Sequence, residues 1–457
     1  YIPDRFEEGY GLNMEAVAAI KEMGAGLIIT VDCGIRSLRE VDYARELGLD
    51  MIITDHHSLG DKVPDAAAVI NPKHPDSRYP EKMLAGVGIA YKLAQALYSE
   101  MPSKAQIAVG DFLDLVAVGT VADLAPLLGE NRKLVMDGLE VLNRLQRPGL
   151  AALASASGLK RGSIGAEAIG FGLGPRINAA GRLDHAYTAA KLLAANNNRM
   201  ARPLAQELNE LNSRRQQLTA ELGAKAETMV DPEDLILIAS DADFEPGVVG
   251  LIASRLAEKN YRPAIILEMG PELSRGSCRS IPEFHITDAL DEVADLLVRH
   301  GGHAQAAGLT VKNENLPQFI ARMRAIAEEK LAGQELVPSI SVDAELSLDE
   351  IDWALQETLA QLEPTGYANP TPIFMSHNVE VMSHRAVGRD GNHLQMRLSS
   401  RNGGKAHQLL SAIAFRQGAW ANELPQLIDV LYTINVNEWN GRRSLQLVVQ
   451  DIRAAQS

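Results

Sequence analysis

Three adjacent residues, Asp55-His56-His57, follow directly on the apolar run 51–54, which predicts a buried strand. One predicted strand earlier, the apolar run 27–31 ends at Asp32 in the same way. Carboxylate and imidazole groups bind divalent metal ions, and a set without thiolates suits Mn²⁺ or Mg²⁺ better than structural zinc. The sequence therefore predicts a metal site where these two strands end.

Two parallel strands must bring these residues together. Residues 37–47 have the periodicity of an amphipathic helix, and Gly48 follows as its stop signal. The resulting β-α-β unit places Asp32 and the triplet at one carboxyl-terminal edge, where open α/β sheets bind ligands. Asp123 ends another apolar stretch and adds a third carboxylate. Divalent ions held in this way, often as a pair, activate water and neutralise a phosphoryl group during its transfer.

A plainer interpretation is that the aspartates cap helices, since Asp before a helix is a common N-cap. For Asp32 alone, which precedes Cys33-Gly34, that interpretation is favoured. Two adjacent histidines at a sheet edge have no capping role, so the triplet favours the metal site.

Two segments in the second half of the chain predict phosphate binding. Ser277 and Arg279, at i and i+2 on an extended segment, point to one face and could clamp a phosphate. In Gly301-Gly302-His303 the paired glycines let backbone N–H groups approach an anion, and the small residues after them predict a helix whose N-terminus faces it. The alternative is a tight turn into a close-packed helix, with His303 as a turn residue.

A local positive patch precedes these segments. Residues 160–182 carry four basic residues against one acidic residue, and Arg176, Asn178 and Arg182 lie among glycines at its end. The alternative is a solvated loop with surface arginines. The glycines favour a close backbone approach to a ligand.

Composition limits the partners. The 457 residues carry a formal net charge of -15, which argues against a broad basic face that coats duplex nucleic acid. The two cysteines, Cys33 and Cys278, give no disulfide framework and favour a reducing cytoplasm. No apolar run reaches membrane-spanning length, so we expect no membrane partner.

We expect an α/β domain over residues 1–150, a basic loop region and a long connecting helix over 151–230, a second α/β domain over 231–335 and a β-rich domain over 336–457. The periodicity is helical from 84 to 145, interrupted at 116–123. In the last domain, period-2 alternation and the Asn440-Gly441 hairpin signal predict a small barrel, with the OB-fold as one candidate.

The motifs together, and their order, resemble the RecJ family within the DHH phosphoesterase superfamily, whose members are 5′ to 3′ exonucleases specific for single-stranded DNA. The matching segments are 3–5, 8–11, 30–34, 55–57, 84–88, 118–123, 174–182 and 301–303. The resemblance covers essentially the whole chain. It implies a DHH-type doubly wound parallel sheet, a long connecting helix, a DHHA1 α/β domain and a C-terminal OB-like β-barrel.

The resemblance also implies roles for individual residues. Asp32, His56 and Asp123 would be metal ligands, His57 would face the scissile phosphate, and Asp55 would orient the imidazoles. Arg5 would contact the cleaved phosphodiester. The substrate-binding residues would be Arg182, Ser277 and Arg279 around the DNA 5′ end, with Arg176, Asn178, Gly301, Gly302 and His303 as companions. The family's Asp-rich first strand precedes the segment 3–5, so we expect an Asp-x-Asp motif upstream of Tyr1.

The implied activity is degradation of single-stranded DNA to mononucleotides in recombination and repair. It would require Mn²⁺ or Mg²⁺, with two ions bound in the complete protein. The enzyme would be a cytoplasmic monomer, assisted by a helicase and a single-strand-binding protein. Two alternatives stay open: a DHH-family oligoribonuclease or nucleotide phosphatase, and a catalytically inactive DNA-binding relative.

Overall fold

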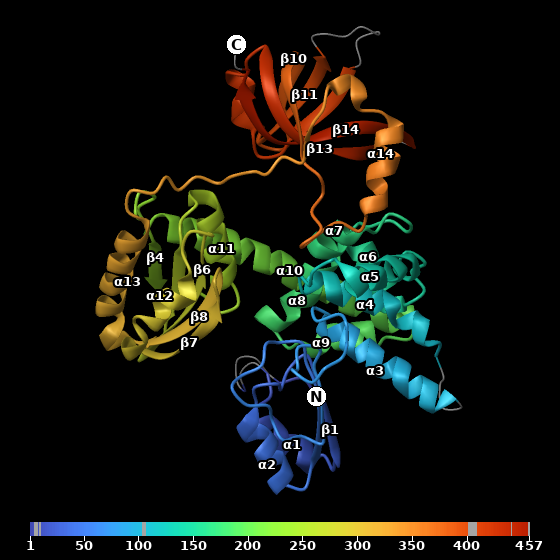
Figure 1. Cartoon of the computed structure of the whole chain (residues 1–457), viewed down its shortest axis with the longest axis vertical. Helices are drawn as coiled ribbons and strands as arrows, with labels where there is room; N and C mark the ends of the chain where they lie inside the picture. Colours follow the sequence, from blue (N-terminus) through green and yellow to red (C-terminus); the bar gives the residue numbers. More distant parts are fainter. Residues whose placement is uncertain (4–7, 9–10, 103–106, 401–408, 440, 456–457) are drawn as a thin grey trace. The chain divides into compact units, whose positions relative to one another are not determined.

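The computed structural model describes residues 1–3, 8, 11–102, 107–400, 409–439 and 441–455. Its first sheet is three-stranded and parallel, in the order β1-β2-β3 (Figure 1). The elements are α1 (Met14–Glu22), β1 (Leu27–Val31), α2 (Leu38–Glu46), β2 (Asp50–Thr54) and β3 (Ala68–Ile70). Val17 of α1 and Val41 of α2 pack with Ile28 and Ile53 of the sheet in one apolar cluster. The predicted β-α-β unit is confirmed, so the ends of β1 and β2 lie at the same edge.

A set of helices follows this sheet: α3 (Gly86–Glu100), α4 (Leu113–Ala122), α5 (Gly129–Leu142), α6 (Pro148–Ala156), α7 (Ala166–Ala168), α8 (Gly174–Leu183) and α9 (Tyr187–Leu193). The segment 116–123, predicted to interrupt the helical pattern, instead lies within α4 and ends at Asp123, the residue that caps it. Val116, Ala117 and Val118 are all buried. A helix that is apolar on every side has no amphipathic period, which explains the wrong prediction.

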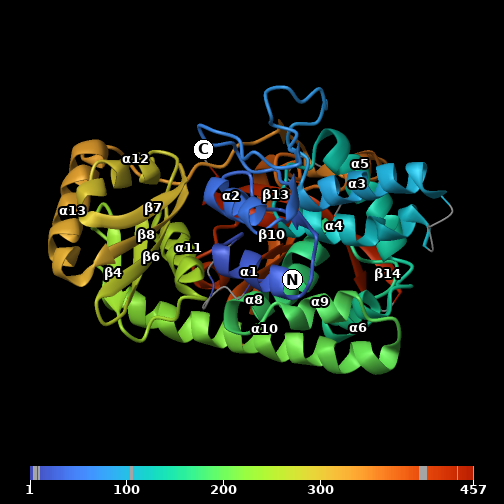
Figure 2. The ribbon, with the colours of Figure 1, turned by 90° about the horizontal axis from the view of Figure 1, so that it is seen from below.

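The long helix α10 (Asn198–Glu227) begins at Asn197, whose side chain accepts a hydrogen bond from the N–H of Met200. It contacts α6, α8 and α9 and also α11 (Val249–Asn260) (Figure 2). Leu208 is fully buried near its middle, and Ala226, at its end, packs in the same apolar cluster as α11. The predicted connecting helix is therefore present.

A second sheet has the strand order β4-β5-β6-β8-β7, parallel between β4 and β5 and antiparallel elsewhere (Figure 1). Its elements are β4 (Leu237–Asp241), β5 (Ala264–Met269), β6 (Leu273–Arg279), β7 (Leu297–His303), β8 (Ala306–Lys312), α12 (Ile286–Asp291) and α13 (Leu316–Leu331). Ile266 of β5 packs under α11, whereas its neighbours Ile265 and Leu267 pack in the cluster formed with α12 and α13. Alternate residues thus face helices on opposite sides, as expected for a strand.

The C-terminal sheet closes into a barrel, because β10 pairs with β11 as well as with β13. The strands are β9 (Ala344–Glu345), β10 (Phe374–Val387), β11 (His393–Ser400), β12 (Leu409–Ala414), β13 (Leu427–Trp439) and β14 (Arg442–Ala454). Tyr432 is fully buried inside and its hydroxyl lies 2.7 Å from the hydroxyl of Ser376. The predicted OB-like barrel is confirmed. Gly441 has φ +74° in the hairpin between β13 and β14, and Asn440 lies outside the described residues.

The chain forms two compact units. One comprises Tyr1–Asp123 and Asp137–Pro338, and the other comprises Leu124–Met136 and Ser339–Ser457. The short segment joins the barrel unit through hydrogen bonds: the N–H of Leu127 donates to the Tyr367 carbonyl at 2.8 Å, and Arg132 donates to the Glu363 carbonyl at 2.9 Å. The domain boundaries drawn from the sequence at 150, 230 and 335 stay predictions. Among the described residues, no helix combines the length and apolar character that a bilayer span requires.

Asp429 is expected to stabilise the barrel through its charge. This buried carboxylate accepts hydrogen bonds from the Asn378 N–H at 3.1 Å and from Arg453 at 3.0 Å, and it lies 3.2 Å from His377. Burial alone would raise the pKa of Asp429, but these contacts more than offset it and lower the pKa. A carboxyl group with a lowered folded-state pKa stabilises the fold above its ordinary pKa, and this stabilisation is lost as the pH falls through the folded-state value.

We therefore expect Asp429→Asn to reduce barrel stability at neutral pH by about 1.5–3 kcal/mol, the effect of hydrogen bonds to a charged group. Thermal unfolding should show this difference shrinking in acid. Asp451→Asn, at an exposed position on β14, is the control. A pH-independent loss, or an equal loss in the control, would contradict the prediction.

Candidate active site

Asp32 is the first residue after β1, and its backbone is in the left-handed region, with φ +65°. Its N–H still donates to the Thr54 carbonyl at 3.0 Å, so the pairing between β1 and β2 continues to this residue. Aspartate tolerates the left-handed conformation better than most residues. The chain therefore turns away from the sheet at Asp32, which leaves its carboxylate at the end of β1.

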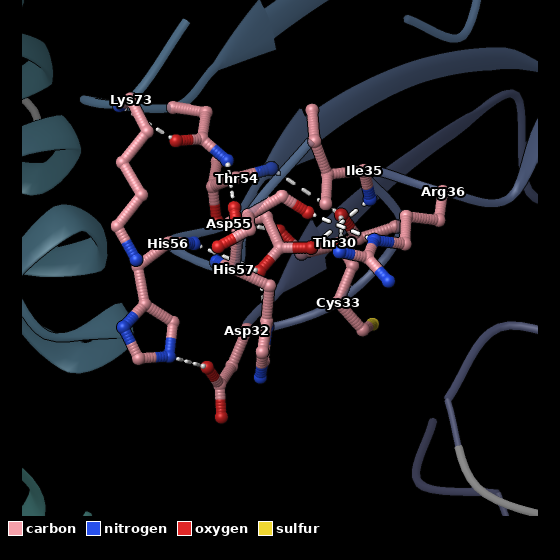
Figure 3. A network of polar contacts seen from close by, with 12 residues as sticks. Thr30, Asp32, Cys33, Ile35, Arg36, Thr54, Asp55, His56, His57 and Lys73 are labelled. Atoms are coloured by element: carbon pink, nitrogen blue, oxygen red, sulfur yellow. Dashed lines mark hydrogen bonds and ion pairs between the residues drawn. The ribbon is translucent and has the colours of Figure 1, made fainter. Parts of the chain in front are cut away.

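Asp32 and His56 face each other across the two strand ends (Figure 3). Nε2 of His56 lies 2.9 Å from Oδ1 of Asp32 and 3.6 Å from Oδ2 of Asp123. Asp32, His56 and His57 each offer a ligand atom within 4.8 Å of the others. The structure thus brings all four of these predicted residues into one cluster, at the sheet edge that the sequence predicts.

The polar atoms at the centre of this cluster fit a metal ion. Oδ1 of Asp32 and Nε2 of His56 are both buried, and although they lie 2.9 Å apart as an ion pair, neither forms a hydrogen bond with any described residue. Unsatisfied buried polar atoms are costly and rare in native proteins. Burial raises the pKa of Asp123, and the nearby charge of Asp32 adds to this effect, although His56 lowers it. A divalent cation would satisfy the orphaned atoms and the crowded carboxylates together, and the donor set suits Mn²⁺ or Mg²⁺.

Asp55 holds the backbone of the cluster's two histidines in place. Its carboxylate accepts hydrogen bonds from the N–H groups of Ile35 at 3.0 Å, His56 at 2.8 Å and His57 at 3.1 Å, and it lies 2.7 Å from Nδ1 of His57. Burial alone would raise the pKa of Asp55, but the bond to His57 and the backbone N–H groups more than offset it and hold the pKa at about 2. Asp55 is therefore an ionised support for both histidines.

His57 is oriented by that support. Its bond to Asp55 raises its pKa, and although burial opposes this, the charges of Asp32 and Asp123 add to the increase. Because Nδ1 is directed at Asp55, Nε2 is left for a ligand or substrate. That His57 faces the scissile phosphate stays a prediction.

Gly86 belongs to the site, although the sequence analysis did not identify it. It begins α3, and a Cβ atom on it would lie 2.5 Å from Oδ1 of Asp32. Only glycine at this position allows the start of α3 to lie so close to the Asp32 carboxylate. The sequence showed only that the motif 84–88 belongs to the resemblance.

A cavity of about 680 Å³ opens on the second sheet. Four arginines, one histidine and one glutamate contribute its charged and titratable side chains: Arg182, Arg275, Arg279, Arg299, His300 and Glu268. Of the predicted substrate-binding residues, Arg182, Ser277, Arg279 and Gly301 line it. The excess of positive charge favours an anion over a cation in this cavity.

The geometry around Ser277 and Arg279 suits a phosphate group. Nη1 of Arg279 lies 3.2 Å from the Ser277 hydroxyl, and burial lowers the pKa of Arg279. Gly250, near the start of α11, lies beside both, because a Cβ atom there would be 3.1 Å from that hydroxyl. Arg182 joins from α8, where Nη1 donates to the Gly247 carbonyl at 3.2 Å. A partly buried guanidinium beside a hydroxyl and a helix N-terminus favours an anion.

The other predicted companions do not line this cavity. The stretch 174–182, predicted as a loop, lies in helix α8, because Pro175 can occupy the first turn of a helix and Gly174 packs closely, with a Cβ atom there 3.1 Å from the Ile169 carbonyl oxygen. Arg176 donates instead to Asn209 at 2.9 Å and to the Gly172 carbonyl at 2.8 Å, and Asn178 is exposed on the helix. Arg5 lies outside the described residues.

The motif Gly301-Gly302-His303 does not precede a helix, so that prediction is wrong. It ends β7 and turns into β8 as a hairpin. A Cβ atom on Gly302 would lie 2.3 Å from the Ala306 carbonyl oxygen, so the close pairing of the two strands requires glycine. The His303 carbonyl accepts a hydrogen bond from the Thr287 hydroxyl at 2.8 Å.

Comparison with known proteins places these features in a family. Residues 1–120 match the DHH family N-terminal domain, residues 233–329 the DHHA1 domain, and residues 342–451 the RecJ OB domain. The fold and the site therefore define a protein of the DHH class. Within that class, the chain belongs to the RecJ family of single-stranded-DNA-specific exonucleases.

The relatives are similar over nearly the whole chain. RecJ of Salmonella typhimurium is 38% identical over 99% of this chain and 81% of its own length. RecJ of Bacillus subtilis is 39% identical over 99% of this chain, which spans 57% of that protein. The crystal structure of RecJ from Thermus thermophilus in complex with Mn²⁺ has a TM-score of 0.84 and 33% identity, and the match covers 97% of this chain and 64% of that one.

Proposed function

We propose that this protein is a metal-dependent exonuclease that degrades single-stranded DNA from its 5′ end to mononucleotides, in recombination and repair. One observation carries the proposal: buried atoms of Asp32 and His56, which lie 2.9 Å apart and form no hydrogen bond, lie beside Asp123 at the edge of the sheet. The arginine-lined cavity on the second sheet gives the same protein a place for an anionic strand end. The names of the RecJ relatives and the Mn²⁺ and Mg²⁺ complexes of RecJ support it.

In this proposal Asp32, His56 and Asp123 hold Mn²⁺ or Mg²⁺, two ions being bound in the complete protein. The ions would activate the attacking water and neutralise the charge on the phosphoryl group. His57, kept protonated to higher pH by Asp55, would face the phosphodiester and donate to one of its oxygens. Asp55 would act as a positioning residue, because it fixes the backbone and ring of His57. Arg5 would contact the same phosphodiester.

The strand polarity would come from the cavity. Arg182, Ser277 and Arg279 would receive the 5′ phosphate, with Gly301 beside them in the lining of the cavity. A pocket that accepts a terminal 5′ phosphate would fix which end of the strand enters, and so would set the 5′ to 3′ direction.

The function is tested by incubating the intact protein with 5′-phosphorylated single-stranded and duplex DNA, with Mn²⁺ or with a chelator. We expect release of 5′ mononucleotides from the single strand alone, and only with the metal. Release from the 3′ end, or equal digestion of the duplex, would contradict the proposal.

Arg279→Ala tests the end pocket. We expect weaker binding of 5′-phosphorylated strands by about 1.5–3 kcal/mol, the effect of a hydrogen bond to a charged group, and little change for 5′-hydroxyl strands. Binding by fluorescence anisotropy without divalent metal measures both. Arg324→Ala, on α13, is the control, because α13 packs on the opposite face of the sheet. An equal loss for both strand ends would place Arg279 outside the pocket.

The remaining alternatives are less well supported. A DHH-family oligoribonuclease or nucleotide phosphatase does not require the matched RecJ OB domain. A catalytically inactive relative does not require a complete set of ligands at Asp32, His56 and Asp123. We further propose a cytoplasmic monomer assisted by a helicase and a single-strand-binding protein. The free thiols of Cys33 and Cys278 support the reducing compartment.

A further inference from the structure

One face of the second sheet is only partly covered by a helix. Ala264 and Ile266 of β5 pack under α11 on this face. The same face continues over β6, β8 and β7, where the cavity lies. Residues directly opposite one another on paired strands share a face, so the registers show which side chains reach the cavity together.

Two rows of side chains cross this open part. In the first row, Ser277 pairs with Gly308, and Gly308 pairs with Gly301, so Ser277 contributes the only side chain of this row. In the second row, Arg275 pairs with Thr310, and Thr310 pairs with Arg299. The first row belongs to the proposed 5′-phosphate pocket. The second has no role in it.

The arginines of the second row have unused hydrogen-bond donors. Among the residues that the structure describes, the guanidinium of Arg275 forms no hydrogen bond or ion pair, although its partner on β5 is Glu268. Oε2 of Glu268 is buried and also lacks a partner. Arg299 donates from Nε to the Thr310 hydroxyl at 3.3 Å, and its two Nη groups form no hydrogen bond with a described residue. Both arginines line the cavity.

The charge in the cavity exceeds the charge of one phosphate. Four arginines face a single glutamate there. A terminal phosphate monoester carries a charge of about -1.5 to -2 at neutral pH. One phosphate at Ser277 and Arg279 would therefore leave positive charge unneutralised in the second row, whereas two phosphates would neutralise it.

We propose that Arg275 and Arg299 form a second phosphate subsite, which binds another phosphate of the strand held at Ser277 and Arg279. This inference rests on the proposed function. The rows are two residues apart, about 6.6–6.8 Å along a strand, which is comparable to the distance between successive phosphates of an extended single strand. Glu268 ends the row on the β5 side and repels an anion there, so the phosphate lies over Thr310 between the two arginines.

The second phosphate has two possible sources, the neighbouring phosphodiester or a further phosphate on a 5′-polyphosphate end. The experiment compares three kinds of strand: a 5′-monophosphate strand, the same strand with one neutral methylphosphonate placed in turn at each of its first three linkages, and a 5′-triphosphate strand. Binding is measured by fluorescence anisotropy in chelator. The proteins are the parent, Arg275→Gln, Arg299→Gln and the control Arg324→Gln, with folding checked by circular dichroism.

If the source is a phosphodiester, the parent should lose about tenfold or more in affinity at one methylphosphonate position, the usual effect of losing a charge-assisted contact. Arg275→Gln and Arg299→Gln should each bind the unmodified strand with a similar loss of affinity. A methylphosphonate at that position should then cause no further loss in either variant. If the source is the strand end, the parent should bind the triphosphate strand more tightly, and both variants should abolish that gain.

Equal losses on all strands for Arg275→Gln, Arg299→Gln and Arg324→Gln would overturn the subsite, because they would reflect only the general charge. No loss in the two cavity variants would overturn it as well. The two proposals fail in different ways. A parent that neither binds nor digests single strands overturns the proposed function, whereas a parent that does both without the position-specific pattern overturns only the subsite.

Discussion

His56→Ala should abolish Mn²⁺-dependent hydrolysis in the intact protein. The substitution removes Nε2, which lies 2.9 Å from Asp32 and 3.6 Å from Asp123 and has no other partner among the described residues. Without this ligand, two carboxylates must hold the ion without an imidazole between them. Loss of metal-ion stabilisation of the transition state by about 4 kcal/mol corresponds to a rate reduction of about a thousandfold.

The measurement pairs turnover with Mn²⁺ titration, because a metal ligand affects both. Asp123→Ala should behave in the same way, while the affinity for single strands in chelator stays near that of the parent. His384→Ala, which makes the same change at an exposed position of the barrel, is the control. Unchanged turnover at equal metal concentration in both His56→Ala and Asp123→Ala would overturn the assignment of the site.

Gly86→Ala is expected to have the second largest effect, although it alters no polar group. Its new methyl group would lie 2.5 Å from Oδ1 of Asp32, so the carboxylate or the start of α3 must shift. A displacement of about 1 Å at a catalytic group can reduce the rate by about a hundredfold. We expect that loss in turnover, together with weaker Mn²⁺ binding.

Gly88→Ala separates this effect from simple destabilisation. It lies in the same helix, and its Cβ atom would meet Leu84 at 2.8 Å, within the core and away from Asp32. This variant should lower the melting temperature yet keep its turnover at temperatures where it is folded. If Gly86→Ala loses only stability, or if Gly88→Ala loses as much turnover, the close approach to Asp32 does not matter for activity.

Local patterns were sufficient to predict much of the fold. The β-α-β unit, α10, both α/β sheets and the barrel each follow from apolar periodicity and turn residues. One prediction failed because the outcome depends on distant partners. Gly301-Gly302 precedes small residues that suit a helix as well as a strand, and only pairing of β8 with β6 and β7 selects the hairpin.

Some residues of the site could likewise be predicted from local patterns, and others could not. Asp32 and the Asp55-His56-His57 triplet were predictable because both follow strands of one parallel unit. Arg275 continues the alternation of Ser277 and Arg279 on β6 and was within reach of the same reasoning. Gly86 was not, because the sequence contains no sign that the start of α3 reaches Asp32. Arg176 looks available in the sequence, but its guanidinium bonds Asn209 and Gly172.

The barrel unit is built from two separate stretches of sequence, and this affects how it could be reused. Leu127 and Arg132 contribute backbone and side-chain bonds to the turn around Tyr367 and Glu363, although more than two hundred residues separate them in the chain. A cut at Ser339 would remove the partners of both residues and leave the remaining protein with an exposed, unsatisfied segment. A protein engineer who wishes to graft this barrel onto another enzyme should therefore transplant residues 124–136 together with it, joined by a new linker.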